Sequence, residues 1–124
     1  MLHSDQMTDE EKVPFAVELL VSNLKESMAF YELLGFEIYR IHEEARFATV
    51  MFQGSVLMLW EHEAPSPRGN GAELRFYIKE GLRALHDAVI AHGITMSKPY
   101  RRADYGLEEF YVDDPDGYHL RFCQ

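Results

Sequence analysis

The sequence predicts an α+β fold in which two strand-helix-strand-strand-strand (βαβββ) modules form a curved, mostly antiparallel eight-stranded sheet with the helices outside. Three observations support this prediction. Residues 24–36 and 82–94 both start with leucine, carry apolar residues at helical spacing and end near a glycine. An alternating strand pattern precedes each of these segments. Further strand patterns and a hairpin follow each one, and such repetition fixes the architecture. The inner face of this sheet would form a cup.

The first module begins with the alternating pattern FAVELLV over 15–21. The helix that follows has a capping box in Asn23 and Glu26, and Gly35 closes it because glycine adopts the left-handed conformation without steric cost. The module ends in a hairpin whose last strand is VLMLW, 56–60.

The second module repeats this order. Its first strand is ELRFYI, 73–78, and Gly93 closes its helix. In the turn at 114–117, DPDG, the proline has the fixed φ that favours a turn, and the glycine occupies the corner whose φ other residues disfavour. The turn leads into the last strand, 118–122. A polar link over 62–70 joins the modules, and the long segment 97–110 is predicted to form a mobile lid or a connector.

Length and composition bound the function. A chain of 124 residues with 47% hydrophobic residues fits one domain, which we expect over 13–124 (modules about 13–61 and 71–124) after a flexible segment over 1–12. The net charge of -9 argues against nucleic acid as a partner. No apolar run is long enough for a membrane span, and no secretion signal is recognisable, so we expect a cytoplasmic protein. Cys123 is the only cysteine.

Strand alternation selects the residues that face the cup, because side chains two apart point the same way. The aromatic members suit a planar or cationic organic ligand, although they would also suit the interior of a cup that is packed shut. No nucleophile motif is present, so we predict no catalytic residue. The predicted ligand-binding residues are Glu18, Trp60, Glu73, Tyr77, Glu109, Tyr111, His119 and Arg121.

Three runs, VSNLKESMAFYELLGFEIY, LRALHDAVIAHGI and YGLEEFYVDDPDGYHLRF, closely resemble the vicinal oxygen chelate superfamily, which includes glyoxalases, extradiol dioxygenases, fosfomycin-resistance enzymes and bleomycin-resistance proteins. The resemblance covers about 13–124. The pattern GSVLMLWEHEAP followed by DPDGYHLRFCQ is most similar to the bleomycin-resistance branch.

The resemblance also implies where a metal would bind. Metal-dependent members hold a divalent cation with His, Glu or Gln side chains, and the matching positions here are Ala16, Met58, Glu73 and Arg121. Only Glu73 suits a hard cation, whereas an arginine would repel it. The resemblance therefore implies no metal and no other cofactor, with an ion pair between Glu73 and Arg121 in place of a metal site.

By this resemblance the protein would be a homodimer that binds a small molecule and sequesters a cationic or aromatic antibiotic. Two alternatives stay open. One is a metal-dependent glyoxalase-like lyase, isomerase or dioxygenase that uses Glu73, His119 and Glu109. The other is a structural or regulatory subunit whose cup is filled by its own aromatic side chains. The replaced metal positions argue against an enzyme without deciding the question.

Overall fold

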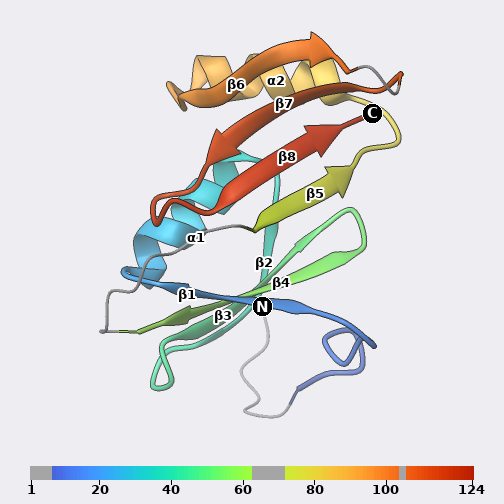
Figure 1. Ribbon diagram of the computed structural model, residues 1–124. Helices are drawn as coiled ribbons and strands as arrows, with labels where there is room; N and C mark the ends of the chain where they lie inside the picture. The colour runs from blue at the N-terminus through green and yellow to red at the C-terminus, as the bar shows by residue number, and fades with distance from the viewer. Residues whose placement is uncertain (1–6, 63–71, 104–105) are drawn as a thin grey trace. The chain divides into compact units, whose positions relative to one another are not determined.

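The chain divides into two compact units, Met1–Pro65 and Ser66–Gln124, and each contains one βαβββ module (Figure 1). The computed structural model describes residues 7–62, 72–103 and 106–124. Apart from His62, the predicted link over 62–70 lies outside the described residues. The prediction that 13–124 forms one domain stays a prediction.

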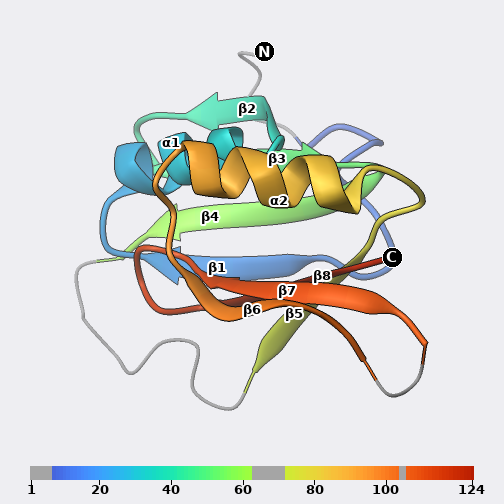
Figure 2. The ribbon, with the colours of Figure 1, turned by 90° about the horizontal axis from the view of Figure 1, so that it is seen from above.

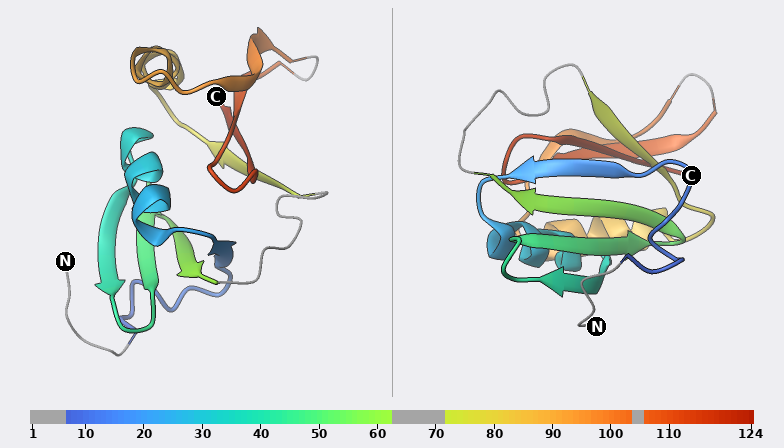
Figure 3. Two further views of the ribbon diagram at one scale, coloured as in Figure 1. Left: turned by 90° about the vertical axis from the view of Figure 1, so that its left-hand side faces the viewer. Right: turned by 90° about the horizontal axis from the view of Figure 1, so that it is seen from below.

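Unit 1 holds a four-stranded sheet in the order β1-β4-β3-β2 (Figure 2). Strand β1 pairs with β4 in parallel, and the other two pairings are antiparallel. Helix α1 connects β1 to β2 and lies against one side of this sheet (Figure 3, left). The elements are β1 (Val17–Val21), α1 (Leu24–Leu33), β2 (Glu37–His42), β3 (Phe47–Phe52) and β4 (Ser55–Glu61).

Unit 2 repeats this arrangement with the order β5-β8-β7-β6. Here β5 pairs with β8 in parallel, and the other pairings are again antiparallel. Neither described helix is long and apolar enough to cross a membrane. The elements are β5 (Glu73–Tyr77), α2 (Leu82–Ala91), β6 (Met96–Arg102), β7 (Glu108–Asp113) and β8 (His119–Cys123).

These elements confirm the predicted α+β class, the two modules and the mostly antiparallel pairing. The eight described strands are divided equally between two sheets, so the repeat in the sequence corresponds to a repeat of whole sheets.

Local sequence accounts for the helix ends. The Asn23 side chain accepts a hydrogen bond from the Glu26 backbone N–H at 2.9 Å, as the capping box predicts. Gly35 and Gly93 follow the two helices with φ of +96° and +72°, a conformation that favours glycine.

A residue at the end of each module's last strand, or directly after it, also caps the helix of that module. Leu24 N–H donates to Oε1 of Glu61, and Leu82 N–H donates to Oε1 of Gln124, both at 2.9 Å. An unpaired amide at each helix start is thereby satisfied. Because Glu61 and Gln124 make the same hydrogen bond, they are equivalent positions and align the residues of the two modules.

The predicted hairpin turns are present. Gln53 and Gly54 have φ of +46° and +85°, as expected of a two-residue turn whose twist matches the flanking strands. In the second turn Oδ1 of Asp114 accepts hydrogen bonds from the backbone N–H groups of Asp116 (2.9 Å) and Tyr118 (2.8 Å), which holds the DPDG corner closed.

The predicted lid over 97–110 is wrong. Most of this segment forms strands β6 and β7, which pair with each other. The charged sequence and Pro99 resemble a loop, but β6 is an edge strand with two register shifts, at Met96/Lys98 and Lys98/Arg101. A proline is tolerated at such irregular positions of an edge strand.

The faces of the sheets follow the predicted alternation. Leu57, Leu59, Leu120 and Phe122 are buried on the helix side. The register sets the orientation of β3, because Thr49 pairs with Met58 and so shares its face. We call the side of each sheet opposite its helix the helix-free face.

Candidate functional site

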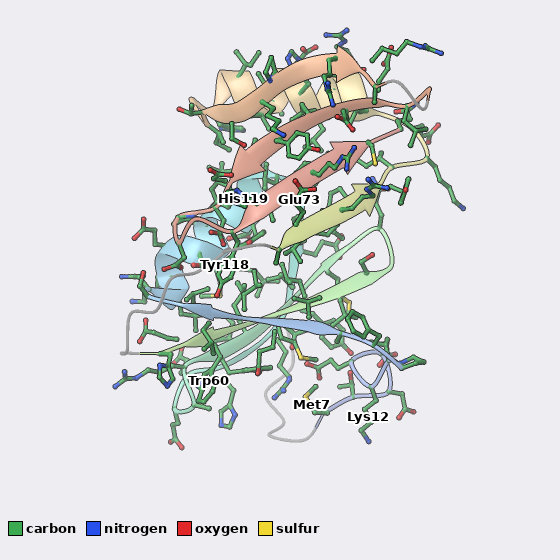
Figure 4. The ribbon with its side chains drawn as sticks, in the orientation of Figure 1. Met7, Lys12, Trp60, Glu73, Tyr118 and His119 are labelled. Atoms are coloured by element: carbon green, nitrogen blue, oxygen red, sulfur yellow. The ribbon has the colours of Figure 1, made fainter. Side chains whose placement is uncertain are left out.

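Three rows of side chains cross the helix-free face of the unit 2 sheet, because directly opposed residues on neighbouring strands point the same way. Six of the eight predicted ligand-binding residues lie in these rows, and Figure 4 shows two of them, Glu73 and His119, on the neighbouring strands β5 and β8. The first row is Glu73, His119 and Asp113; the second is Arg75, Arg121, Tyr111 and Lys98; the third is Tyr77, Cys123, Glu109 and Arg101.

Glu109 is the centre of this face. Its side chain is fully buried, and each carboxylate oxygen is bound by a different arginine. Oε2 accepts from Nε and Nη2 of Arg101 at 3.0 and 2.9 Å, and Oε1 accepts from Nε and Nη2 of Arg121 at 2.9 and 2.6 Å. Such double donation to one oxygen is strong and directional, so Glu109 fixes both guanidinium groups.

The predicted ion pair between Glu73 and Arg121 is present, but it is long and half-exposed. Nη1 of Arg121 lies 3.8 Å from Oε2 of Glu73, whose side chain is 47% exposed. The sequence placed Glu109 on the correct face but did not identify it as the main partner of Arg121. The reason lies in the register, because β7 brings Glu109 within diagonal reach of Arg121 across the β7–β8 pair.

Tyr111 lies beneath two cations. The Lys98 ammonium is 4.7 Å and the Arg121 guanidinium 5.3 Å from its ring centroid, distances at which cation–π attraction acts. Burial, with the nearby carboxylates of Glu109 and Glu73, raises the pKa of the Tyr111 phenol, and the arginines oppose this only partly.

This environment predicts a late titration of Tyr111. Its phenol should ionise above the ordinary value of about 10. A spectrophotometric titration at about 295 nm, compared with that of Tyr111→Phe, isolates its contribution among the seven tyrosines. The neutral form is favoured by folding, so the associated stability is full below pH 10 and is lost as the pH rises through the raised pKa. A difference curve centred below pH 10 would contradict the assignment.

The first row is acidic and accessible. Nδ1 of His119 lies 2.7 Å from Oδ1 of Asp113, and their side chains are 45% and 41% exposed. The opposite end of the face contains Tyr77, which is 62% exposed and accepts a 2.6 Å hydrogen bond from Nη1 of Arg75. The face therefore has an acidic edge, a cationic middle row and an aromatic corner.

The alternative metal set of Glu73, His119 and Glu109 is not assembled in the structure. Glu109 is bound by two arginines, and the His119 ring contacts Asp113. Within the described ranges, no three His, Cys, Asp or Glu side chains lie close enough together to hold a metal ion.

The remaining two predicted residues belong to unit 1. Glu18 is exposed on β1 and pairs in register with Met58 of β4. Trp60 is 40% exposed, and its ring meets that of His62 edge-on at 5.4 Å. Both lie on the helix-free face of their own sheet, as the alternation predicts.

Sequence reasoning missed three contributors to unit 2. Lys98 and Arg101 were assigned to a loop, so their alternation was not used. His86 lies on α2, and its ring packs against Tyr100 and Phe110 at centroid distances of 5.1 and 5.8 Å. The helical spacing Leu82, His86, Val89 carried that signal.

Known proteins resemble this chain in part of its sequence or in its fold. The large subunit of 3-isopropylmalate dehydratase from Pyrobaculum calidifontis is 29% identical over 66 residues, a match that covers 53% of this chain but only 16% of that protein. A bleomycin-binding protein solved in complex with bleomycin is 22% identical with a TM-score of 0.73, and the bleomycin resistance determinant encoded on the transposon Tn5 is 20% identical with a TM-score of 0.76. Each alignment covers 91% of this chain and 98% of the other, and at these identities the likeness shows the fold. The family model for the glyoxalase/bleomycin resistance protein/dioxygenase superfamily matches residues 14–122, and the chain therefore belongs to that superfamily.

Proposed function

We propose that this protein binds an organic small molecule on the helix-free face of unit 2 without a catalytic metal, and sequesters it rather than transforming it. The ligand class we propose is a cationic or aromatic antibiotic of the bleomycin type.

The observation that carries the proposal is the environment of Arg121. By family resemblance this position would hold a metal ligand. Here the arginine side chain is 11% exposed, and its guanidinium is fixed by the buried carboxylate of Glu109 and lies over Tyr111. A permanent cation held in this way repels a divalent ion and presents a polar, aromatic surface instead.

The exposed groups of the face suit a ligand with positive charge. Glu73 and Asp113 offer carboxylates at the acidic edge, and the Tyr77 ring offers a surface for stacking. Two structural neighbours carry bleomycin in their names, which agrees with this ligand class. Glu18 and Trp60, in unit 1, stay predicted contacts.

We also propose that the protein acts as a homodimer. Three large apolar side chains are well exposed: Phe15 at 82%, Tyr77 at 62% and Ile90 at 55%. Scattered exposed apolar residues also occur on monomers, so the oligomeric state has to be measured. Sedimentation velocity should give twice the 14.4 kDa chain mass, and a single species at the chain mass would reject the dimer.

Calorimetric titration with metal-free bleomycin tests ligand binding. We expect saturable binding to the wild type. Glu73→Gln should weaken it by roughly fivefold, since a half-exposed ion pair contributes up to about 1 kcal/mol. Glu80→Gln, an exposed carboxylate of the same unit outside the three rows, is the matched control and should bind like the wild type. Equal affinity in both variants would remove Glu73 from the site, and no binding to any of them would reject this ligand class.

Metal analysis separates the proposal from the enzyme alternative. Protein purified without chelators or a metal-affinity tag should contain far less than one equivalent of Zn, Ni, Mn or Fe per chain by plasma mass spectrometry. About one tightly bound equivalent, lost in Glu73→Gln, would favour the metal-dependent enzyme.

A further inference from the structure

The N-terminal arm, residues 7–12, places a carboxylate on the sheet of unit 1. The sequence predicted a flexible segment over 1–12, yet in its described part the Glu11 side chain is fully buried. Figure 4 labels the two ends of the arm, Met7 and Lys12. A short turn shapes the arm, in which the N–H groups of Glu11 and Lys12 donate to the Thr8 carbonyl at 3.0 and 3.1 Å.

Both oxygens of this carboxylate are bound. Nε of Arg40 lies 3.1 Å from each of them, the Thr49 hydroxyl donates to Oε2, and Thr8 N–H donates to Oε1 at 3.0 Å. Arg40 and Thr49 are 2% and 0% exposed. Burial alone would raise the pKa of Glu11, but the hydrogen bonds from Thr49, Thr8 and Arg40 outweigh it, and the pKa is lowered.

The two halves of this contact differ in origin. Arg40 and Thr49 are directly opposed on β2 and β3, so the sheet holds the guanidinium and the hydroxyl in place. Glu11 comes from an irregular segment that precedes the first strand. The sheet thus positions the cation and the hydroxyl, and the arm brings the carboxylate to them.

The repeat supports this distinction. Glu61 and Gln124 are equivalent positions in the two modules. When the modules are aligned on these two residues, the strand pairing makes Phe47 of β3 the counterpart of Glu109 of β7. Unit 2 therefore neutralises its arginines with a carboxylate built into a strand, whereas unit 1 has a phenylalanine at that position. The arm supplies the missing carboxylate.

We propose that Arg40 and Thr49 form a carboxylate-binding site on the helix-free face of unit 1, and that Glu11 occupies it as an internal ligand. A free monocarboxylate such as acetate takes the site when the Glu11 carboxylate is absent. In the wild type the tether gives Glu11 a high effective concentration, so free acetate is excluded. This inference does not rest on the function proposed for unit 2.

Chemical rescue with acetate tests the site. Thermal unfolding is followed in sodium acetate and in sodium chloride of equal ionic strength at about pH 7. Glu11→Ala leaves room for acetate, so its unfolding temperature should rise saturably in acetate. At ten times the dissociation constant the folded-to-unfolded ratio should increase about elevenfold. Wild type should show no such rise.

Two further variants serve as controls for the acetate experiment. Glu11→Gln fills the site with an uncharged side chain and should not respond to acetate. Glu10→Ala alters the neighbouring arm residue, which accepts a 3.2 Å hydrogen bond from the Tyr39 hydroxyl, and it should behave like the wild type. If acetate stabilises Glu11→Ala no more than it stabilises the wild type, the site does not exist. If Glu11→Ala is unfolded in chloride, regain of its circular dichroism in acetate supports the site, and continued unfolding in both salts overturns it.

Discussion

Replacing Glu109 by glutamine is expected to destabilise the protein by roughly 3 to 5 kcal/mol, as for removal of one partner from a buried ion pair. The carboxylate accepts from two arginines at once, and an amide can present its oxygen to only one of them. The other guanidinium would then face an N–H2 group. We place the loss toward the lower end of the range, because Arg101 is 56% exposed and can recover some hydration. Urea unfolding at neutral pH measures it.

Glu73→Gln is the matched control for Glu109→Gln. Both are glutamates on the same sheet face, and both lie near Arg121, but Glu73 is about half exposed and its contact is long. Its replacement should cost less than about 1 kcal/mol. If the two variants lose equal stability, or if Glu73→Gln loses more, Arg121 depends on Glu73 as the sequence alone suggested.

Replacing Arg40 by methionine is expected to have an effect of similar size in unit 1. Methionine fills the space of the arginine stem but leaves the Glu11 carboxylate buried without its cation. We expect a loss of roughly 3 to 5 kcal/mol at neutral pH. In the double variant Glu11→Gln/Arg40→Met much of this loss should be recovered, because no unpaired charge remains. A double variant no more stable than Arg40→Met would mean that packing, rather than charge, limits this site.

The pH dependence of the Arg40→Met deficit gives a second test. In the wild type the lowered pKa of Glu11 adds stability that is present above the ordinary value of 4.5 and is lost as the pH falls through the lowered pKa. In Arg40→Met the pKa of the same carboxyl should rise relative to the wild type, since the hydrogen bond and the charge of Arg40 no longer lower it while burial remains. Protonation then costs the wild type more stability than it costs the variant, so the stability difference should shrink as the pH falls below 4.5. A difference that stays constant as the pH falls from 7 through this range would contradict the charge interpretation.

The repeat in the sequence was enough to predict the fold because its signals are local. Helical spacing ended by Gly35 and Gly93, and the DPDG turn, each depend on a few adjacent residues. The edge strand β6 was missed because Pro99 and its charged neighbours suit a loop equally well, and only pairing with β7 decides the matter. The composition of β6 alone therefore does not distinguish a strand from a loop.

For the candidate site, the sequence predicted which face of the sheet each residue lies on, but not which residues contact each other. Alternation placed Glu109, Tyr111 and Arg121 on one side of the sheet, but the partner of Arg121 depends on which residues are opposed across β7 and β8. The burial of Glu11 was harder still. A polar segment rich in charge normally stays solvated, and its docking depends on Arg40 and Thr49, far along the chain.

The parallel pairing of first and last strands constrains how each unit folds. Val17 pairs with Leu57, and Glu73 pairs with His119, so the sheet of a unit is complete only when the end of its module has been made. Closing such long loops is slow compared with forming a helix or a hairpin. During synthesis the hairpin of β3 and β4 can form first and then receive β1, and unit 1 can complete its sheet while unit 2 is still emerging from the ribosome. The repeat thus allows the two sheets to form separately, the sheet of unit 1 before the sheet of unit 2.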